Sequence, residues 1–459
     1  MKKLILMIAT LSLSALLLVC GCFGVGEKGA DGRDGKDGKD GQDVSIYEIY
    51  ESVKNTAGNE NLTYEQFLKE YLSFSDDEIS QSVNPQAVIN KSLMSSVSIL
   101  TRFSYSNYGR TTYKVYAGSG VFLSVNKETG DGYVVTNCHV VYDDTSNEKY
   151  ANEVRLYLYG QDVKNVNYSY DSNYNFLYDS NYVMLAEVIG AAKQYDVALL
   201  KITGSDVIKR NEIFAAEFSD SDDVYVGDKV YLVGNAKGEG VSCASGIVTK
   251  DSEFIDLSLS DKNPNDLTQY RVIRTDAPVN HGNSGGGMFD YKGKLIGLVN
   301  SKNDESDIDN MGYALPASNV KRLVKLMYDE YTANGGSVNR SFGVNRALLN
   351  ITTEITDSYA QYDENRGLAE IYETVAVNEV TGSPALNKLK NKDVIKHLKI
   401  TDGSGNTVED KEITRRYYVT DLLLSVRQGY TVSLTLVRGG EDIAVDIPYD
   451  SSSYFTYYD

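Results

Sequence analysis

The chain has 459 residues, with 45 Lys or Arg against 64 Asp or Glu, so its formal net charge is −19. This acidic balance, with no basic cluster to offset it, argues against nucleic-acid binding. The length predicts about two or three domains, and a hydrophobic content of 42% is ample for ordinary globular cores.

Residues 1–21 are typical of a secretory signal peptide, because two lysines precede an apolar run from Leu4 to Val19. This run is short for a transmembrane helix. It ends in VCGCFG, which resembles a bacterial lipobox with Gly21 before Cys22, so cleavage would leave Cys22 to carry a diacylglycerol. Such a lipid would hold the protein at the cell membrane. Simple cleavage and an uncleaved anchor are the alternatives, and each also places the mature protein outside the cytoplasm.

Residues 22–43 form a spacer in which glycine occurs at every third position from 26 to 41. The period is collagen-like, but it lacks proline, and six triplets would hardly hold a triple helix unaided. We therefore favour a flexible, charged spacer. Residues 44–84 predict two short helices, since capping boxes begin at Ser45 and at Thr63. We interpret this segment as a small helical spacer, with partner docking as the alternative.

Three polar residues in the middle of the chain interrupt apolar or glycine-rich stretches. His139, one of three histidines, ends an apolar strand in YVVTNCHVV, and Asp196 interrupts the apolar run YDVALLKI. A carboxylate buried in such a run is costly unless it is paired. Ser284 stands among glycines in TDAPVNHGNSGGGMF. Glycines let consecutive backbone N–H groups turn toward one point, as an oxyanion hole requires.

These three residues suit nucleophilic catalysis, because a serine hydroxyl needs a base and the base needs an orienting carboxylate. Their chain order, His139 then Asp196 then Ser284, is that of the double β-barrel proteases and not of subtilisins or α/β-hydrolases. Each signal alone also has a structural explanation. Ser284 would then lie in a glycine-rich turn between strands, and His139 would be a structural histidine at a strand end.

Seven motifs extend this pattern from about Pro85 to Ser337. They are GSGVFLS (118–124), TNCHVV (136–141), YDVALLKI (195–202), VGNAKG (233–238), GIVT (246–249), TDAPVNHGNSGG (275–286) and MGYALP (311–316). In this order they resemble the motifs of the HtrA/DegP-like trypsin-fold serine proteases. Together they are highly specific, whereas any one alone would be weak.

The resemblance implies two six-stranded barrels with a catalytic triad in the cleft between them. Ser284 would be the nucleophile, His139 the general base and Asp196 its orienting partner, while the backbone of Gly282, Asn283 and Ser284 would form the oxyanion hole. No metal or organic cofactor is implied. The expected substrates are misfolded or damaged exported proteins, and a homotrimer is a family expectation.

This sequence departs from the family pattern at three positions. His281 replaces the usual proline, Cys138 precedes the histidine, and Gly287 stands where proline is common. These departures bear on the rigidity of the loop more than on its chemistry. Two isolated free thiols and a disulfide between Cys138 and Cys243 both remain open, and no cysteine cluster suggests a metal site.

In trypsin-fold enzymes, the residue about six positions before the serine forms the base of the primary specificity pocket. We use this position to predict the pocket. Pro278 stands there, so no carboxylate is placed to attract Lys or Arg, and Val279, Leu298 and Val299 offer small apolar walls. We therefore predict cleavage after Val, Ala, Leu or Ile. The insert at 159–182, rich in Asn, Tyr, Asp and Ser, is predicted to be an exposed loop. The resemblance implies that such a loop contacts neighbouring subunits, which suggests a role in regulating activity.

Residues 341–449 resemble a single PDZ domain, which would bind extended peptides by adding a strand to a sheet edge. We expect a helix at 421–428 beside the peptide groove, a carboxylate-binding loop at 367–372, and a tail at 450–459. An interdomain packing module without a peptide ligand is the alternative. The resemblance is carried by YETVAVNEV (372–380), GSPA (382–385), LKNKDVI (389–395) and VSLTLVRGGEDIAVDI (432–447).

The predicted fold class is therefore mostly β: a trypsin-like double barrel at 85–337, an α+β PDZ domain and a short helical N-terminal segment. The predicted function is that of an exported, membrane-anchored serine endopeptidase in protein quality control. The main alternative is a catalytically silent, peptide-binding or chaperone-like surface lipoprotein. A surface adhesin built on the collagen-like segment is a weaker one, because the chain has no array of repeats.

Overall fold

The computed structural model describes residues 85–161, 169–170, 176–177, 181–258, 267–302, 311–337, 344–364 and 366–458, together with isolated positions between 50 and 67. The chain divides into two compact units, Met1–Val83 and Asn84–Asp459. The predicted signal peptide, Cys22 and the collagen-like spacer lie outside the described residues. None of the described helices is both long enough and apolar enough to span a membrane.

In the first unit, Tyr50 and Phe67 come one from each predicted helix. Both side chains are buried, and their ring centroids lie 5.7 Å apart. This contact is the packing that two short amphipathic helices need, since neither would be stable alone in water.

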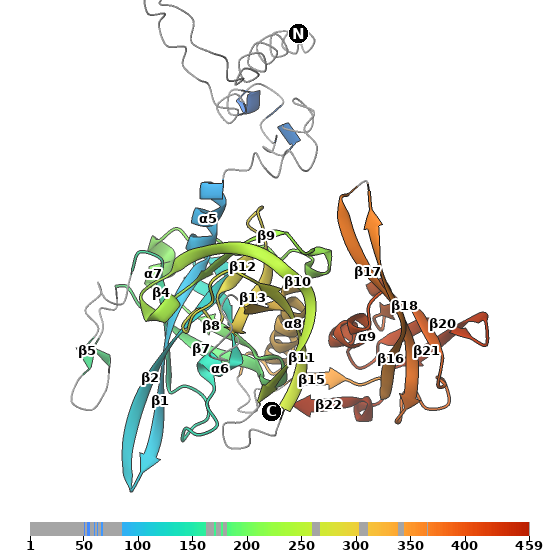
Figure 1. Ribbon diagram of the computed structural model, residues 1–459. Helices are drawn as coiled ribbons and strands as arrows, with labels where there is room; N and C mark the ends of the chain where they lie inside the picture. Colours follow the sequence, from blue (N-terminus) through green and yellow to red (C-terminus); the bar gives the residue numbers. More distant parts are fainter. Residues whose placement is uncertain are drawn as a thin grey trace, which may run out of the picture. The chain divides into compact units, whose positions relative to one another are not determined.

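The second unit begins with helix α5 (Pro85–Met94) and a closed six-stranded barrel, which we call the first barrel (Figure 1). Alternate side chains of its strands fill a core that includes Val97, Ile99, Phe122 and Leu200, as the two-residue period of a strand requires. The strand order is β1 (Ser96–Asn107), β2 (Arg110–Asn126), β3 (Asp131–Thr136), β8 (Val197–Ile202), β7 (Met184–Ala192) and β4 (Glu153–Leu158).

A second closed barrel of six strands follows along the chain. Its own core includes Val230, Leu232, Ile273 and Met288. The prediction of a double six-stranded barrel is confirmed. The strand order is β10 (Ser242–Ser258), β11 (Leu267–Thr275), β14 (Gly312–Pro316), β13 (Leu295–Lys302), β12 (Gly287–Phe289) and β9 (Lys229–Gly234).

The two barrels and helix α8 (Ala317–Ala333) share a third core, which joins Val121 and Leu199 of the first barrel to Tyr270 and Leu298 of the second. The apolar face of α8 closes this core. The helix approaches so closely that a Cβ added at Gly190 on β7 would lie 2.5 Å from Met327 Cβ. This shared core fixes the barrels against each other and so positions the residues between them.

Five shorter elements lie between these strands. They are α6 (Cys138–Val141), η1 (Lys193–Tyr195), α7 (Asp206–Arg210), η2 (Ser221–Asp223) and η3 (Ala236–Gly238). Of the predicted regulatory insert, the structure describes only the paired strands β5 (Ser169–Tyr170) and β6 (Phe176–Leu177) and the residues at its two ends.

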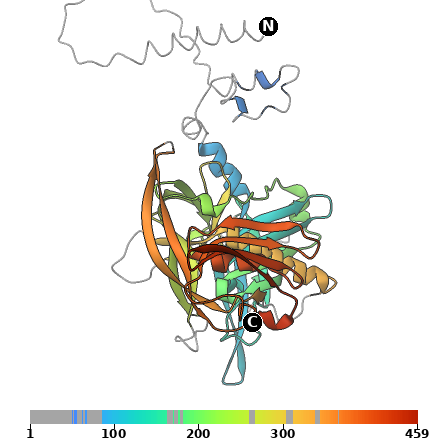
Figure 2. The ribbon, with the colours of Figure 1, turned by 90° about the vertical axis from the view of Figure 1, so that its right-hand side faces the viewer.

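The C-terminal region is a β sheet with a short helical segment, and its strands can be followed in Figure 2. This β-rich architecture is consistent with a PDZ domain. Its elements are β16 (Ile351–Asp363), β17 (Leu368–Val380), β18 (Val394–Thr401), β19 (Thr407–Glu412), α9 (Tyr417–Asp421), η4 (Leu422–Ser425), β20 (Thr431–Arg438) and β21 (Glu441–Pro448).

Three local predictions for this region are wrong. The helical segment spans 417–425 and not 421–428. Residues 368–372 of the predicted carboxylate-binding loop belong to β17, which pairs with β16 in a long hairpin, because the β-branched and aromatic residues of IYETVAV favour a strand. The predicted tail contains η5 (Ser452–Tyr454) and β22 (Phe455–Tyr458), and β22 pairs with β15 (Val344–Ala347).

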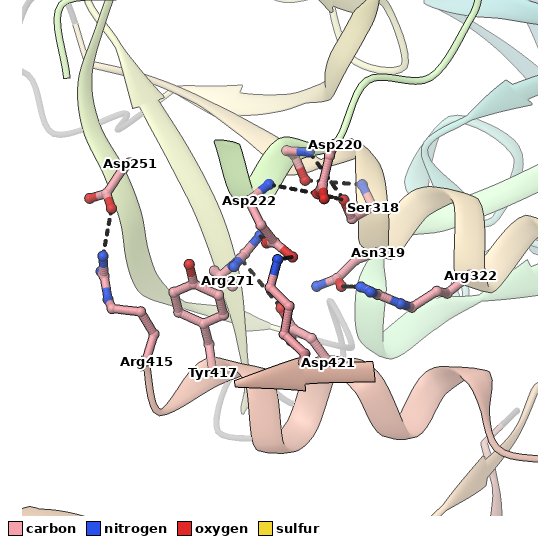
Figure 3. Close-up of polar contacts among 12 residues, drawn as sticks. Asp220, Asp222, Asp251, Arg271, Ser318, Asn319, Arg322, Arg415, Tyr417 and Asp421 are labelled. Atoms are coloured by element: carbon pink, nitrogen blue, oxygen red, sulfur yellow. Dashed lines mark hydrogen bonds and ion pairs between the residues drawn. The ribbon is translucent and has the colours of Figure 1, made fainter. Parts of the chain in front are cut away.

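Buried ionic contacts join this region to the second barrel, as Figure 3 shows. Arg271 on β11 donates to Asp222 at 2.9 Å, and the centre of its guanidinium lies 3.8 Å from the ring centroid of Tyr417 on α9. Its Nε also lies 3.4 Å from Asp421 Oδ2, without the geometry of a hydrogen bond. We call Asp222, Arg271, Tyr417 and Asp421 the junction cluster.

Candidate active site

The predicted base and its carboxylate are hydrogen-bonded to each other. His139 lies on α6, directly after the barrel strand β3, and Asp196 lies between η1 and β8. His139 Nδ1 is 2.7 Å from Asp196 Oδ2, and the backbone N–H of His139 donates to Asp196 Oδ1 at 2.8 Å. The imidazole is thus held by both its backbone and its ring, with half of its side chain exposed.

Asp196 is only 2% exposed, and its backbone has a left-handed φ of 52°, which aspartate tolerates better than most residues. Asn300 Nδ2 donates to its Oδ2 at 2.6 Å, and Asn137 Nδ2 donates to its backbone carbonyl at 2.9 Å. These bonds fix both the carboxylate and the backbone of Asp196 in place.

Asp196 also controls the titration of its neighbours. Burial by itself lowers the pKa of His139, but the charge of Asp196 and the hydrogen bond to it outweigh burial, so that the pKa lies above its ordinary value. Burial, with a further contribution from Asp196, raises the pKa of the Cys138 thiol well above its usual range. Cys138 is therefore a neutral packing residue beside the base.

The two cysteines in the described part of the chain, Cys138 and Cys243, are free thiols. The disulfide left open by the sequence is absent between them. In the same described residues, no group of three or more His, Cys, Asp or Glu side chains is arranged to hold a metal ion.

Ser284 lies at the other side of Asn300. Its Oγ donates to the Asn300 backbone carbonyl at 2.8 Å. Among the described residues, the hydroxyl has no other hydrogen-bond partner. Its backbone carbonyl accepts from Ser119 N at 2.8 Å. Asn300 thus contacts both Asp196, through its amide, and Ser284, through its carbonyl, so the structure brings the three predicted residues into one site.

The glycine-rich loop around Ser284 is tightly packed. A Cβ added at Gly282 would lie 2.2 Å from Asn235 O, and one at Gly285 would lie 2.2 Å from Ser119 O. Both residues also have left-handed φ angles, 93° and 84°, so both positions favour glycine. The carbonyl of His281 accepts from Lys237 N at 2.6 Å, which holds the loop where the family has proline.

Of the three predicted oxyanion donors, Asn283 already has a partner. Its backbone N–H donates to Asn280 O at 3.0 Å. The N–H groups of Gly282 and Ser284 have no hydrogen-bond acceptor among the described residues. The backbone N–H groups available to an oxyanion are therefore those of Gly282 and Ser284. A donor that is already bonded cannot stabilise new charge without a rearrangement.

The predicted specificity pocket is only partly compatible with the structure. Pro278 is exposed and Val279 is half-buried, and Val279 packs across Gly312, where an added Cβ would lie 2.4 Å from Val279 Cγ2. Leu298 and Val299, in contrast, lie inside two hydrophobic cores with at most 1% exposure. Neither of these two side chains lines an open pocket as predicted, because the shared core and the second barrel's own core take up the two faces of β13.

Sequence reasoning missed Asn300 and Tyr270, which complete the site. Asn300 is a polar residue in the apolar strand sequence LIGLVNSK, the same kind of signal that singled out Asp196. Tyr270 lies on β11 and donates from its hydroxyl to Asn300 Oδ1 at 3.0 Å. No local signal distinguishes it, because the chain has 36 tyrosines. We call His139, Asp196, Tyr270, Ser284 and Asn300 the site cluster.

Comparisons with known proteins agree with this arrangement. The family model described as a trypsin-like peptidase domain matches residues 118–298, a range that contains His139, Asp196 and Ser284. The serine protease Do-like HtrA of Bacillus subtilis (strain 168) is 26% identical over 339 residues, which are 73% of this chain and 64% of that protein. The probable periplasmic serine endoprotease DegP-like of Bartonella henselae is 28% identical over 338 residues, 73% of this chain and 53% of that protein.

The chain thus spans between half and two thirds of the length of these relatives. Among solved structures, the HtrA-type protease AlgW with decapeptide covers 82% of this chain and 99% of its own, at 19% identity and a TM-score of 0.48. The family model and the curated relatives together support a HtrA/DegP-like trypsin-fold serine protease domain in this part of the chain.

Proposed function

We propose that this protein is an exported serine endopeptidase that degrades misfolded or damaged proteins. The observation that carries the proposal is the hydrogen-bonded His139–Asp196 pair, joined through Asn300 to Ser284 in a glycine-rich loop. A histidine oriented by a buried carboxylate beside a serine is the arrangement that acyl transfer needs. The relatives, which include probable periplasmic endoproteases, support an extracytoplasmic location.

The proposed reaction begins when a polypeptide carbonyl enters the site. Ser284 Oγ leaves the Asn300 carbonyl and attacks the substrate carbon, while His139 Nε2 takes the hydroxyl proton. Asp196 stabilises the resulting imidazolium, and the N–H groups of Gly282 and Ser284 stabilise the oxyanion. His139 then gives the proton to the leaving amine, which breaks the peptide bond. Water attacks the acyl-enzyme by the same path, and Ser284 recovers its proton.

The current hydrogen bond from Ser284 to Asn300 is compatible with this sequence, because catalytic hydrogen bonds often form only when substrate is bound. We propose that cleavage follows Val, Ala, Leu or Ile. An uncharged Pro278 at the predicted pocket base and Val279 packed across Gly312 support this preference.

Three further parts of the proposal concern partners. The C-terminal region is a PDZ-type peptide-binding domain, and its outer strands β16 and β21 offer sheet edges to which an extended peptide would add. Lipidation at Cys22 anchors the protein to the bacterial cell surface, and the chain assembles as a homotrimer. The mechanism needs no metal or organic cofactor.

The test compares the wild type with Ser284→Ala, using unfolded casein and a fluorophosphonate probe. We expect the wild type to cleave casein and to be labelled, and the variant to do neither. Labelling of the wild type without cleavage would indicate a resting enzyme that awaits a peptide ligand or assembly. If neither protein is labelled or cleaves casein, even with added C-terminal peptides, the protein is instead a peptide-binding or chaperone-like surface lipoprotein.

A further inference from the structure

Tyr270 is a buried tyrosine whose hydroxyl points into the polar site. It is 3% exposed and belongs to the core shared by the two barrels. Its hydroxyl donates to Asn300 Oδ1 at 3.0 Å. The ring accounts for the packing of this position, whereas the hydroxyl has a polar partner in the site cluster. The two parts of the side chain therefore have separable roles.

The hydrogen bond from Tyr270 determines which end of the Asn300 amide faces Asp196. An asparagine amide carries an acceptor oxygen at one end and a donor NH₂ at the other. With Tyr270 bound to Oδ1, the NH₂ end lies against Asp196 Oδ2 at 2.6 Å. The opposite orientation would place a carbonyl oxygen against a carboxylate oxygen and the NH₂ against the tyrosine hydroxyl.

Asn300 contacts both sides of the site. Its side chain holds the carboxylate that faces His139, and its backbone carbonyl accepts from Ser284 Oγ at 2.8 Å. A tilt of the Asn300 side chain would change the position of the Asp196 carboxylate. Small displacements of this kind are costly, because catalysis depends on the alignment of the reacting groups.

We propose that Tyr270 is a positioning residue for the reaction: its hydroxyl fixes the Asn300 amide, and through it the orientation of Asp196 toward His139. This inference rests on the proposed function, in which the Asp196–His139 pair activates Ser284. Tyr270 does not touch the substrate and is not a catalytic residue.

The surroundings of Tyr270 keep its hydroxyl protonated, so that it remains a neutral hydrogen-bond donor to Asn300. Burial, with a smaller contribution from the charge of Asp196, raises the pKa of Tyr270 far above its ordinary value, so its proton is present at every working pH. Other titratable groups near Asp196 include His139 and Cys138 on α6, and Lys193 on η1 lowers the pKa of Cys138. Tyr195 directly precedes Asp196, and the guanidinium of Arg346 lies over the ring of Tyr195.

The test replaces Tyr270 with phenylalanine in the full-length protein purified in detergent, which keeps the ring and removes only the hydroxyl. Tyr449→Phe is the matched control: Tyr449 is also buried, and its hydroxyl donates to the Leu348 carbonyl at 3.1 Å in the C-terminal region. We expect Tyr270→Phe to lower kcat about 10-fold, because a buried acceptor loses its partner, while KM and the fluorescence-monitored unfolding midpoint follow the control.

A second readout does not require activity. The chain has three histidines, so ¹⁵N-histidine NMR can follow the titration of His139 directly. Without the Tyr270 hydroxyl, the Asn300 amide is no longer held with its NH₂ against Asp196, so more of the negative charge of the carboxylate faces the imidazole. Tyr270→Phe is therefore expected to raise the pKa of His139, and in Tyr449→Phe it is expected to stay as in the wild type. In an Asn300→Ala background, the Tyr270 substitution should have no additional effect on either readout.

The proposal is overturned if Tyr270→Phe matches Tyr449→Phe in kcat and in the His139 titration, or if its effect persists undiminished in the Asn300→Ala background. The histidine titration separates this failure from that of the proposed function. A wild type without protease activity, in which Tyr270→Phe still shifts the His139 titration, would refute the function and keep the positioning contact.

Discussion

Tyr270 and Arg271 are neighbours on β11, yet they belong to two buried polar clusters that are built in different ways. In the site cluster, one carboxylate receives hydrogen bonds from a neutral amide, a backbone N–H and a half-exposed imidazole. In the junction cluster, a fully buried guanidinium lies between two carboxylates and against the ring of Tyr417. The site cluster includes a half-exposed side chain, whereas the charged side chains of the junction cluster are each less than 10% exposed.

This difference shows how the same strand serves two purposes. The charge of Asp196 is balanced only by neutral donors and by a histidine, so it acts on the one group that can gain a proton. The charges of the junction cluster act mainly on one another, and removing one partner would leave an uncompensated buried charge. Substitutions in the site cluster should therefore change turnover, and loss of the guanidinium from the junction cluster should change stability.

The largest effect is expected for Asp196→Asn. The variant keeps the size of the side chain but loses the charge that stabilises the imidazolium and selects the tautomer, so we expect kcat to fall by about 10⁴-fold. Kinetics on a peptide with a small apolar residue at the cleavage site measure this loss, and thermal unfolding measures stability. A comparable loss of stability, or turnover within 10-fold of the wild type, would contradict the division between the two clusters.

Arg271→Met should produce the opposite pattern. It leaves Asp222 and Asp421 buried without the guanidinium, and the expected cost is about 3–5 kcal/mol in the free energy of unfolding. Arg274→Met on the same strand is the control, because Arg274 is more exposed and its ion pair with Glu253 is 3.4 Å long; its expected cost is below about 1 kcal/mol. Denaturant titration and limited proteolysis compare the two. Equal costs would show that the junction cluster is no more important than a surface ion pair.

The sequence predicted the parts of the molecule that depend on local pattern. His139, Asp196 and Ser284 each interrupt an apolar or glycine-rich stretch, and an apolar run such as Val197–Ile202 indicates a buried strand. The double barrel follows from the resemblance carried by the seven motifs. The side chain of Asn300 interrupts its strand in the same way, so the same argument would have found it. Gly282 and Gly285 likewise follow from the demand for close backbone approach.

The remaining features depend on how distant segments come together. Tyr270 reaches Asn300 from β11 to β13 across the intervening strand β14, a contact that exists only when the barrel has closed. The junction cluster joins η2, β11 and α9, which are far apart in the chain. Strand β22 has four residues, too few for a clear alternation, and its pairing with β15 gives it order. Leu298 and Val299 were assigned to a pocket because hydrophobicity alone does not distinguish a wall from a core.

The smallest expected effect, and the sharpest test of the junction, is that of Asp421→Asn. Arg271 donates to Asp222, and Lys411 Nζ lies 4.0 Å from the same carboxylate, while Asp421 Oδ2 is buried without a hydrogen bond. Burial raises the pKa of Asp421, and the charge of Arg271 lowers it by less. The folded chain therefore keeps this proton to a higher pH than the unfolded chain does.

The contribution of Asp421 to stability is thus complete below the ordinary aspartate pKa of about 3.9 and is lost as the pH rises through the raised value. Asparagine keeps the volume and removes the charge, so the free energy of unfolding at neutral pH should stay within about 1 kcal/mol of the wild type or rise. Asp222→Asn, which weakens the bond to Arg271, should cost about 1.5–3 kcal/mol. In denaturant titrations between pH 4 and 7, the wild type should lose stability as Asp421 gives up its proton, and Asp421→Asn should not show this loss.

The opposite outcome is that Asp421→Asn lowers the free energy of unfolding as much as Arg271→Met does. Both carboxylates would then be needed to hold the guanidinium, and the third charge would not be merely tolerated.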